Sequence, residues 1–161
     1  MQTMMIRGNG YSQHQFNHGS LRATARRVAE TLPKLLARYD AQAVVVTGKS
    51  GMSVAFATMM LADIPLIVVR KRGENSHGEM IEGVIDVEVR RYIILDDFVS
   101  SGTTVRTVVR DIDDYCRVQR YARPEPVAVA CYYSDLIFSG RVAARYDDHF
   151  EMIDFIPQVA V

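Results

Sequence analysis

Two adjacent carboxylates, Asp96 and Asp97, stand just before a run of small and hydroxyl-bearing residues that extends from Ser100 to Thr104. The backbone N–H groups of such a run, its hydroxyl groups and the positive end of a following helix can together bind one anion. A carboxylate pair beside an anion site suits a ligand that also carries hydroxyl groups or a metal ion. This combination is suited to binding a sugar phosphate.

The residues on either side predict how these groups are held. The apolar run Tyr92-Ile93-Ile94-Leu95 favours a strand that is buried on both faces. After the hydroxyl-bearing run, Val105, Val108, Val109 and Ile112 recur at helical spacing. The carboxylates therefore lie at the carboxyl end of a strand, where open α/β sheets bind their ligands.

A second predicted anion site follows the strand expected over residues 43–46. In Thr47-Gly48-Lys49-Ser50-Gly51, the glycines allow close approach of the backbone, and the side chains add two hydroxyl groups and a positive charge. The Gly-Lys-Ser sequence also matches part of a P-loop, so a P-loop-like NTPase is an alternative. A P-loop needs a glycine where this chain has Ala43, and strand-forming valines fill the interval, so we favour the simpler anion loop.

A third group, Arg70-Lys71-Arg72, follows the strand expected over residues 65–69. His77 comes a few residues later, in a stretch from Gly73 to Gly83 that has no core pattern and predicts a loop. Three cations at the end of a strand either form a solvated turn or face an anion. The neighbouring anion sites favour the second interpretation.

The chain of 161 residues is expected to form one domain. A helix is predicted from an N-cap at Ser20 to about Leu36, and further strands over residues 84–89 and 127–133. Alternating helices and strands predict a three-layer α/β fold, with a mostly parallel sheet covered by helices on both faces. The core would span about residues 20–133. Residues 1–19 and 135–161 are left over, with a short strand around residues 152–156.

Composition limits the possible partners. The formal net charge is zero, which gives no argument for binding nucleic acid, and no apolar run is long enough to cross a membrane. Cys116 and Cys131 lack the spacing of a metal site, so we expect buried free thiols in a reducing compartment. These features predict a cytoplasmic protein.

The stretch from Tyr92 to Thr104 resembles the signature segment of the type I phosphoribosyltransferases, which bind phosphoribosyl pyrophosphate (PRPP). Phe98 departs from it, because an aliphatic residue is usual there. The resemblance implies that Asp96 and Asp97 contact the ribose hydroxyl groups and Mg²⁺, directly or through water. The residues expected to bind the 5'-phosphate are Ser100, Ser101, Gly102, Thr103 and Thr104.

The resemblance extends to the other two groups. The residues expected to bind pyrophosphate are Thr47, Gly48, Lys49, Ser50, Gly51, Arg70 and Lys71, with a strained or cis peptide implied at Gly48 and Lys49. The Arg-Lys and the later His-Gly are similar to the closing loop of orotate phosphoribosyltransferases. That similarity adds Lys71, Arg72 and His77 to Asp96 and Asp97 as catalytic residues. The His-Gly stands one residue further along than in those enzymes, and their loop lysine is missing, with Arg72 a possible substitute.

The reaction implied is displacement of pyrophosphate from PRPP by a nitrogen of a base. Enzymes for 6-oxopurines carry an aspartate at the position of Ser100 and a lysine near Tyr132, and both are absent here, so a pyrimidine such as orotate or an adenine-like purine is favoured. Phe98, Tyr132 and Tyr133 either stack on the base or belong to the core. The resemblance also implies a small hood built from residues 1–19 and 135–161, and a homodimer. A non-catalytic regulator that binds PRPP or nucleotides remains the alternative.

Overall fold

The computed structural model describes residues 18–71, 73, 80–83, 88–97, 99, 101–132, 136–138, 141–146 and 149–154. In chain order its elements are α2 (His18–Tyr39), β1 (Ala43–Thr47), α3 (Gly48–Met59), β2 (Leu66–Val69), β3 (Ile81–Gly83), β4 (Arg91–Asp96), α4 (Thr103–Gln119), β5 (Glu125–Cys131), β6 (Leu136–Phe138), β7 (Arg141–Tyr146) and β8 (His149–Asp154).

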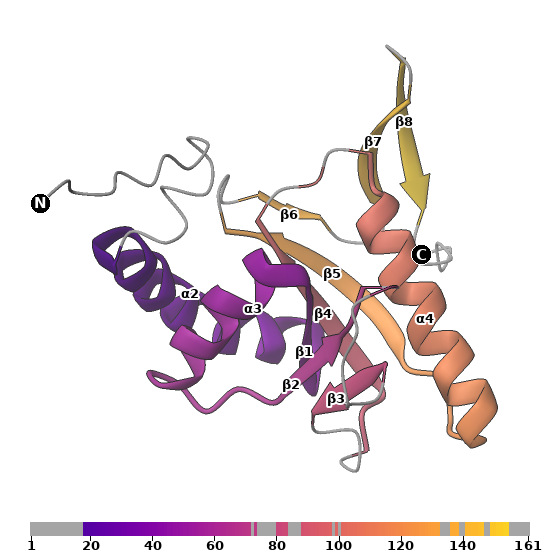
Figure 1. Ribbon diagram of the computed structural model, residues 1–161, viewed down its shortest axis with the longest axis horizontal. Coiled ribbons are helices and arrows are strands. Elements are labelled where there is room, and N and C mark those ends of the chain that lie inside the picture. Colours follow the sequence, from indigo (N-terminus) through magenta and orange to yellow (C-terminus); the bar gives the residue numbers. More distant parts are fainter. Residues whose placement is uncertain are drawn as a thin grey trace, which may run out of the picture.

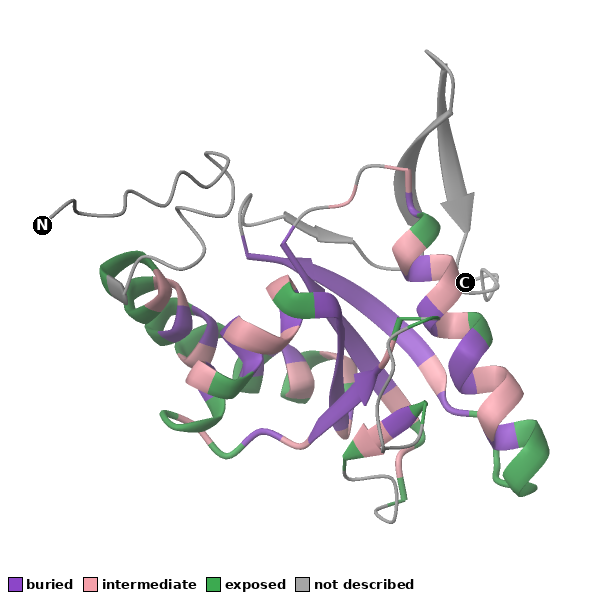
Figure 2. Ribbon diagram, viewed as in Figure 1, coloured by how far each residue is buried: buried purple, intermediate pink, exposed green. Residues whose placement is uncertain are grey.

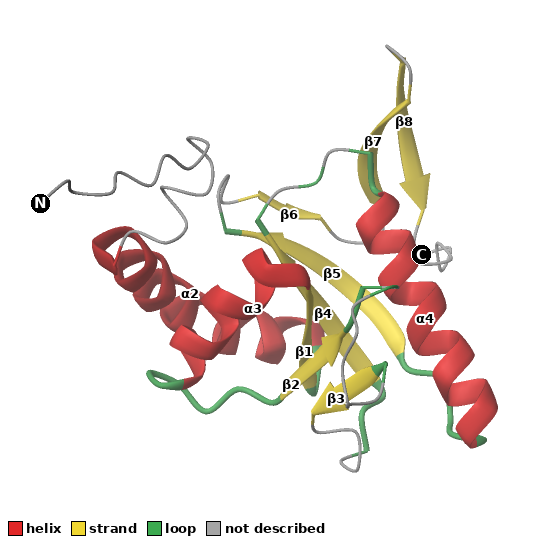
Figure 3. Cartoon of the chain, viewed as in Figure 1, coloured by secondary structure: helices red, strands yellow, loops and turns green. Residues whose placement is uncertain are grey.

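The main sheet has six strands in the order β3-β2-β1-β4-β5-β6 (Figure 1). The four central strands are parallel, whereas β3 and β6 pair antiparallel at the two edges. Helices α2 and α3 lie on one side of the sheet and α4 lies on the other (Figure 3). The predicted three-layer α/β fold with helices on both faces is confirmed.

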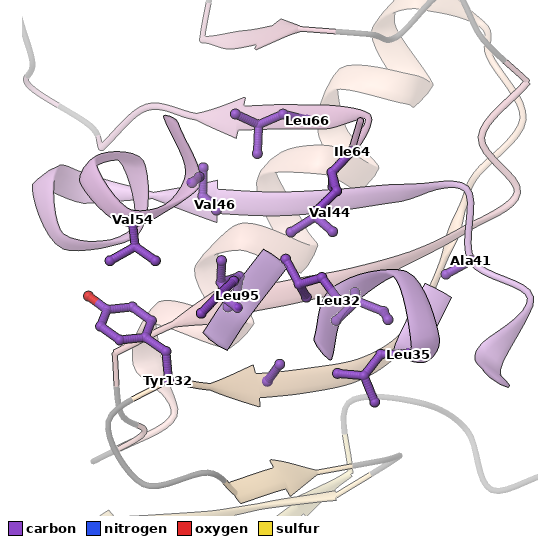
Figure 4. Packing of buried hydrophobic residues seen from close by; sticks show 14 of the residues in the cluster. Leu32, Leu35, Ala41, Val44, Val46, Val54, Ile64, Leu66, Leu95 and Tyr132 are labelled. Atoms are coloured by element: carbon purple, nitrogen blue, oxygen red, sulfur yellow. The ribbon is translucent and has the colours of Figure 1, made fainter. Parts of the chain in front are cut away.

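The central strands are buried and apolar except at their ends, as expected where both faces of a sheet are covered (Figure 2). Their side chains alternate between two clusters. Val44, Val46 and Leu95 point to the side of α2 and α3 (Figure 4), whereas Val45 and Ile94 point to the side of α4. Each helix adds an apolar stripe to its own cluster, so the sheet is fixed from both sides.

The edge strand β3 corrects the sequence prediction. Ile81 to Gly83 was expected to belong to a loop, but it pairs with β2, and Ile81 is buried. Residues 88 and 89, the described part of the strand predicted over 84–89, are not in a strand, and the rest of that prediction lies outside the described residues. An edge strand of three residues is too short for a periodic pattern, so its pairing partner specifies it.

The C-terminal part contains more strand than the sequence indicated. The short strand expected around residues 152–156 corresponds to β8, which ends at Asp154 and forms a separate two-stranded sheet with β7. The predicted hood stays a prediction, because residues 1–17 and 155–161 lie outside the described part. No helix in the described ranges is long and apolar enough to cross a membrane.

Gly83 generates a stability prediction. Its φ is +115°, and an added Cβ would stand 2.1 Å from the carbonyl oxygen of Leu66, so Gly83→Ala combines backbone strain with a clash against β2. We expect a loss of roughly 2–4 kcal/mol in the free energy of unfolding, measured by urea denaturation. Gly73→Ala is the matched control, because its φ of +89° has open space around it, and it should cost about 1–2 kcal/mol. Equal losses in the two variants would show that β3 does not pack against β2 as described.

Candidate active site

The topology of the sheet points to one place for a ligand. From β1 the chain crosses through α3 to β2 on one side, and from β4 it crosses through α4 to β5 on the other side. The carboxyl ends of β1 and β4 are therefore the point where the strand order reverses, and open α/β sheets bind ligands in the crevice at such a point.

A cavity of about 400 Å³ lies at this point. Nine of its lining residues are ones that the sequence predicted: Thr47, Ser50, Lys71, Asp96, Asp97, Ser101, Gly102, Thr103 and Thr104. Val99 and Val105, which the sequence analysis did not predict as site residues, also line it. Residues from three separate segments of the chain thus meet around one cavity.

The two carboxylates end β4 and are 7% and 6% exposed, respectively. One carboxylate oxygen of Asp96 accepts a hydrogen bond of 2.9 Å from the backbone N–H of Asp97. Burial raises the pKa of Asp96 above its usual value, although that hydrogen bond and the positive charge of Lys71 oppose the rise. Asp96 is therefore a desolvated acid that gains from an additional cation or hydrogen-bond donor in the cavity.

The turn after Val99 leads directly into the first turn of α4. Gly102 is buried with a φ of +69°, which allows the chain to turn directly into the helix. The Ser101 hydroxyl lies 2.8 Å from the Thr103 hydroxyl and 3.3 Å from its backbone nitrogen. The guanidinium of Arg106 donates to the Ser101 carbonyl at 3.2 Å. Arg106, which the sequence analysis missed, therefore braces this turn from the first turn of α4.

The segment after β1 differs from the loop that was expected. Helix α3 begins at Gly48, so Gly48 to Gly51 is the first turn of a helix, entered through a φ of +65° at Gly48. No cis peptide occurs within the described ranges. Thr47 is buried and Ser50 is half-buried, and both line the cavity, whereas Lys49 is exposed and does not. Within this first turn Gly51 packs closely on Val46, where an added Cβ would be 3.3 Å from the Val46 Cβ.

Lys71 connects the basic segment to the carboxylates. A Cβ on Gly48 would lie 2.8 Å from the Cε and 3.0 Å from the Nζ of Lys71, so the lysine side chain lies directly over the Gly48 backbone. Its charge also acts on Asp96. A larger residue at position 48 would displace the end of the Lys71 side chain, in addition to the strain of the positive φ.

Arg70 has a different partner. Its guanidinium bonds both carboxylate oxygens of Glu82 on β3, at 2.7 and 2.8 Å. It lines a neighbouring cavity of about 280 Å³ that shares Thr47, Lys71, Thr103 and Thr104 with the first. Arg70 therefore stands at the edge of the site rather than among the residues of the main cavity.

Of the three aromatic residues predicted to contact the base or the core, the structure describes only Tyr132. Tyr132 is 6% exposed and belongs to the apolar cluster on the side of α2 and α3, where its ring lies near Val54 (Figure 4). Its carbonyl accepts a hydrogen bond from Arg27 of α2. The predictions for Arg72, His77, Phe98, Ser100 and Tyr133 lie outside the described residues.

The cavity is compatible with magnesium. In the described part of the chain no group of three or more His, Cys, Asp or Glu residues could hold a metal ion alone. Asp96 and Asp97 nevertheless offer two buried carboxylates to one cavity. This donor set fits Mg²⁺, which is commonly bound through one or two carboxylates, with water and substrate phosphates as the other ligands.

Comparison of the sequence with known proteins gives partial matches. No family model matches the chain. It is 32% identical to the HGPRTase-like protein 1 of Haloquadratum walsbyi, across 44% of each chain. It is 30% identical to a hypoxanthine/guanine phosphoribosyltransferase of Methanospirillum hungatei, across 54% of each chain. The chain thus spans about half the length of these curated relatives.

Comparison of the structure covers more of the chain. A phosphoribosyltransferase from Corynebacterium diphtheriae superposes with a TM-score of 0.53 and 25% identity, over 74% of this chain and 65% of that one. The orotate phosphoribosyltransferase of Mycobacterium tuberculosis superposes with a TM-score of 0.51 and 25% identity, over 74% of this chain and 63% of the enzyme. The shared fold and the partial sequence matches support the resemblance to the type I phosphoribosyltransferases that the sequence indicated.

Asp96 generates a prediction about pH. Because burial raises its pKa in the folded state, the folded protein binds this proton more readily than the unfolded chain does. The free energy of unfolding of the ligand-free protein should therefore fall as pH rises from the unfolded pKa through the folded one. Asp96→Asn removes this loss, so the variant should be at least as stable as the wild type at pH 7.

Thermal unfolding of both proteins between pH 4 and pH 7 measures the effect. The difference in stability between variant and wild type should grow with pH over this range. A variant that is less stable at every pH, by a constant amount, would show that the Asp96 carboxylate is not desolvated. Asp114→Asn, at an exposed position paired with Arg117, is the control and should show no such trend.

Proposed function

We propose that this chain transfers the 5-phosphoribosyl group of PRPP to a nitrogen of a nucleobase and releases pyrophosphate. The observation that carries the proposal is the single cavity shared by the carboxylates of β4, the hydroxyl-bearing turn before α4, and Thr47 with Lys71. A phosphate, a pair of ribose hydroxyl groups and a pyrophosphate each need one of these three groups.

Each group would have a distinct role. The 5'-phosphate would lie at the amino end of α4, among Ser101, Thr103 and Thr104, where the backbone N–H groups and the helix dipole favour an anion. Asp96 and Asp97 would accept hydrogen bonds from the ribose hydroxyl groups and fix the orientation of the sugar. The reaction needs no covalent nucleophile, since holding the reactants in line and stabilising the departing charge lower the barrier.

Pyrophosphate would lie over the first turn of α3. Thr47 and Ser50 supply hydroxyl groups there, and the ammonium group of Lys71 lies above Gly48. Lys71 thus meets the negative charge that develops on the leaving group. Asp96 and Asp97 would hold Mg²⁺, directly or through water, and the ion would neutralise charge on pyrophosphate.

The base is proposed to be a pyrimidine such as orotate, or an adenine-like purine. The serine at position 100 carries this preference, because it cannot act as the acid that 6-oxopurine enzymes use there. The curated relatives are named for hypoxanthine and guanine instead. Orotate enzymes are among the structural neighbours.

The P-loop alternative does not fit the structure. β1 continues as a fully buried strand to Thr47, so residues 43–47 cannot wrap around a phosphate. We also propose a cytoplasmic homodimer. The two free buried thiols, Cys116 and Cys131, are compatible with a reducing compartment.

Binding of PRPP tests the site. Because the ligand would bind only the folded chain, PRPP with Mg²⁺ should stabilise the fold and raise the thermal midpoint. At a PRPP concentration 100 times Kd, the free energy of unfolding should increase by about 2.7 kcal/mol. The double variant Asp96→Asn, Asp97→Asn should lose most of this increase relative to its own ligand-free midpoint. Asp114→Asn should keep it, and Mg²⁺ alone should produce little of it. An unchanged shift in the double variant would remove the carboxylates from the site.

Turnover decides between an enzyme and a regulator. Pyrophosphate release should be measured at fixed PRPP with adenine, hypoxanthine, guanine, uracil and orotate in turn and in competition. We expect release with orotate or adenine to exceed release with hypoxanthine or guanine. Binding of PRPP without release on any base would favour the non-catalytic regulator, and a preference for hypoxanthine or guanine would refute the assignment based on Ser100.

A further inference from the structure

A further cavity, of about 540 Å³, lies between α4 and the sheet at the end opposite to the candidate active site. It is lined by residues that precede β4 and β5, such as Arg90 and Pro124, and by the carboxyl-terminal half of α4. Its described lining shares no residue with the two cavities at the carboxyl ends of the strands. Because β4 has six residues, roughly 20 Å of sheet separates the two ends, so both can be occupied at once.

Most of the lining of this cavity is apolar or aromatic. Ile67 of β2, Ile81 of β3 and Ile112 of α4 are buried members of the cluster on the α4 side of the sheet. Tyr115 and Tyr121 add two aromatic rings, with centroids 6.3 Å apart and planes tilted by 52°. Aromatic rings favour such tilted arrangements, so a third ring can pack beside this pair. The volume and the lining are typical of a small-molecule site.

The rim of this cavity carries two positive charges and one negative charge. The charged residues of its described lining are Arg90, Arg123 and Glu88, and all three are exposed. Arg123 forms an ion pair of 2.7 Å with Asp113, whereas the guanidinium of Arg90 has no ion pair within the described ranges. Arginine binds planar oxyanions such as carboxylates through paired hydrogen bonds. An apolar ligand that carries one negative charge therefore matches both the interior and the rim.

The Tyr92 hydroxyl supplies a hydrogen-bond donor beside this cavity. Tyr92 is fully buried, and its hydroxyl oxygen has no hydrogen-bond partner in the described part of the chain. Burial raises the pKa of Tyr92 above its usual value, and the charge of Asp113 adds to the rise whereas Arg123 opposes it, so the hydroxyl keeps its proton. Arg123 and Cys116, which both act on this hydroxyl, line the cavity. A buried donor without an acceptor costs stability, so an acceptor at this wall of the cavity is favoured.

We propose that this cavity binds a small aromatic anion, whose flat ring packs beside Tyr115 and Tyr121 and whose carboxylate, or a similar planar oxyanion, faces Arg90 and Arg123. A carboxylate beside Arg123 also brings an acceptor to the Tyr92 hydroxyl. A neutral apolar ligand would leave both the Arg90 guanidinium and this hydroxyl without a partner. The site does not depend on the proposed reaction, so a chain with no turnover on any base would still bind the anion.

Titration of the isotope-labelled protein with 2-naphthoate, followed by NMR, tests the proposal. Amide signals around the cavity should shift and saturate with a Kd of about 1 mM or tighter, the affinity expected for a ligand of this size. The neutral analogue 2-naphthylmethanol should bind about five times more weakly, because it offers no charge to the arginines. Saturating PRPP with Mg²⁺ should not displace the probe. The absence of a saturable shift, equal affinity for both probes, or displacement by PRPP overturns the proposal.

Two variants locate the bound probe. Ala122 is exposed and lines the cavity, so Ala122→Trp should fill it and weaken binding of 2-naphthoate at least tenfold, whereas Ala37→Trp, at an exposed position of α2, should bind like the wild type. Arg90→Gln should weaken binding about fivefold, and Arg26→Gln, also exposed on α2, should not. Circular dichroism verifies that the variants fold. Unchanged binding by a folded Ala122→Trp variant would place the probe elsewhere and overturn the proposal.

Tyr92→Phe tests the part assigned to the hydroxyl. Because the hydroxyl has no acceptor in the ligand-free protein, its removal should leave the thermal midpoint unchanged or raise it. The same variant should bind 2-naphthoate about five times more weakly, because one hydrogen bond to a charged group is lost. A variant that binds the probe as tightly as the wild type would overturn the contact between the hydroxyl and the anion.

Discussion

The parallel pairing of β1 with β4 is the constraint on which the rest of the molecule depends. The register joins Ala43 to Tyr92 and Val45 to Ile94, so both strands end at the same edge of the sheet. That pairing brings Thr47 beside the Asp96-Asp97 pair, although about fifty residues separate them in the chain. It is stable because both strands are buried on both faces, between two apolar clusters that the helices complete.

The same burial lowers the stability of the ligand-free protein. Two carboxylates at the end of a buried strand lose most of their water, and the raised pKa of Asp96 reflects this cost. A buried charge without enough partners destabilises the fold, so Lys71 and the Asp97 N–H offset only part of the loss. The ligand-free protein therefore keeps a desolvated carboxyl group that hydrogen-bond donors or a cation in the cavity would stabilise.

The two turns that border the cavity are held in different ways. Gly102 and Arg106 fix the turn before α4, one through a left-handed backbone and the other through a hydrogen bond to the Ser101 carbonyl. At the amino end of α3, Gly48 leaves the space that the Lys71 side chain occupies. Both turns thus depend on a glycine, but the first glycine shapes the chain and the second also makes room for a cation from another strand.

The sequence alone determined the central strands, helix α4, the carboxylate pair and the hydroxyl-bearing turn, because burial on two faces, helical spacing and turn chemistry are local properties that a short stretch of residues displays. Only the tertiary structure decided which groups meet. It placed Lys71 over Gly48, paired Arg70 with Glu82, turned Tyr132 into the core, and made a strand of Ile81 to Gly83. Each of these depends on contacts between residues distant in the chain, through strand register and side-chain packing, which no local pattern encodes.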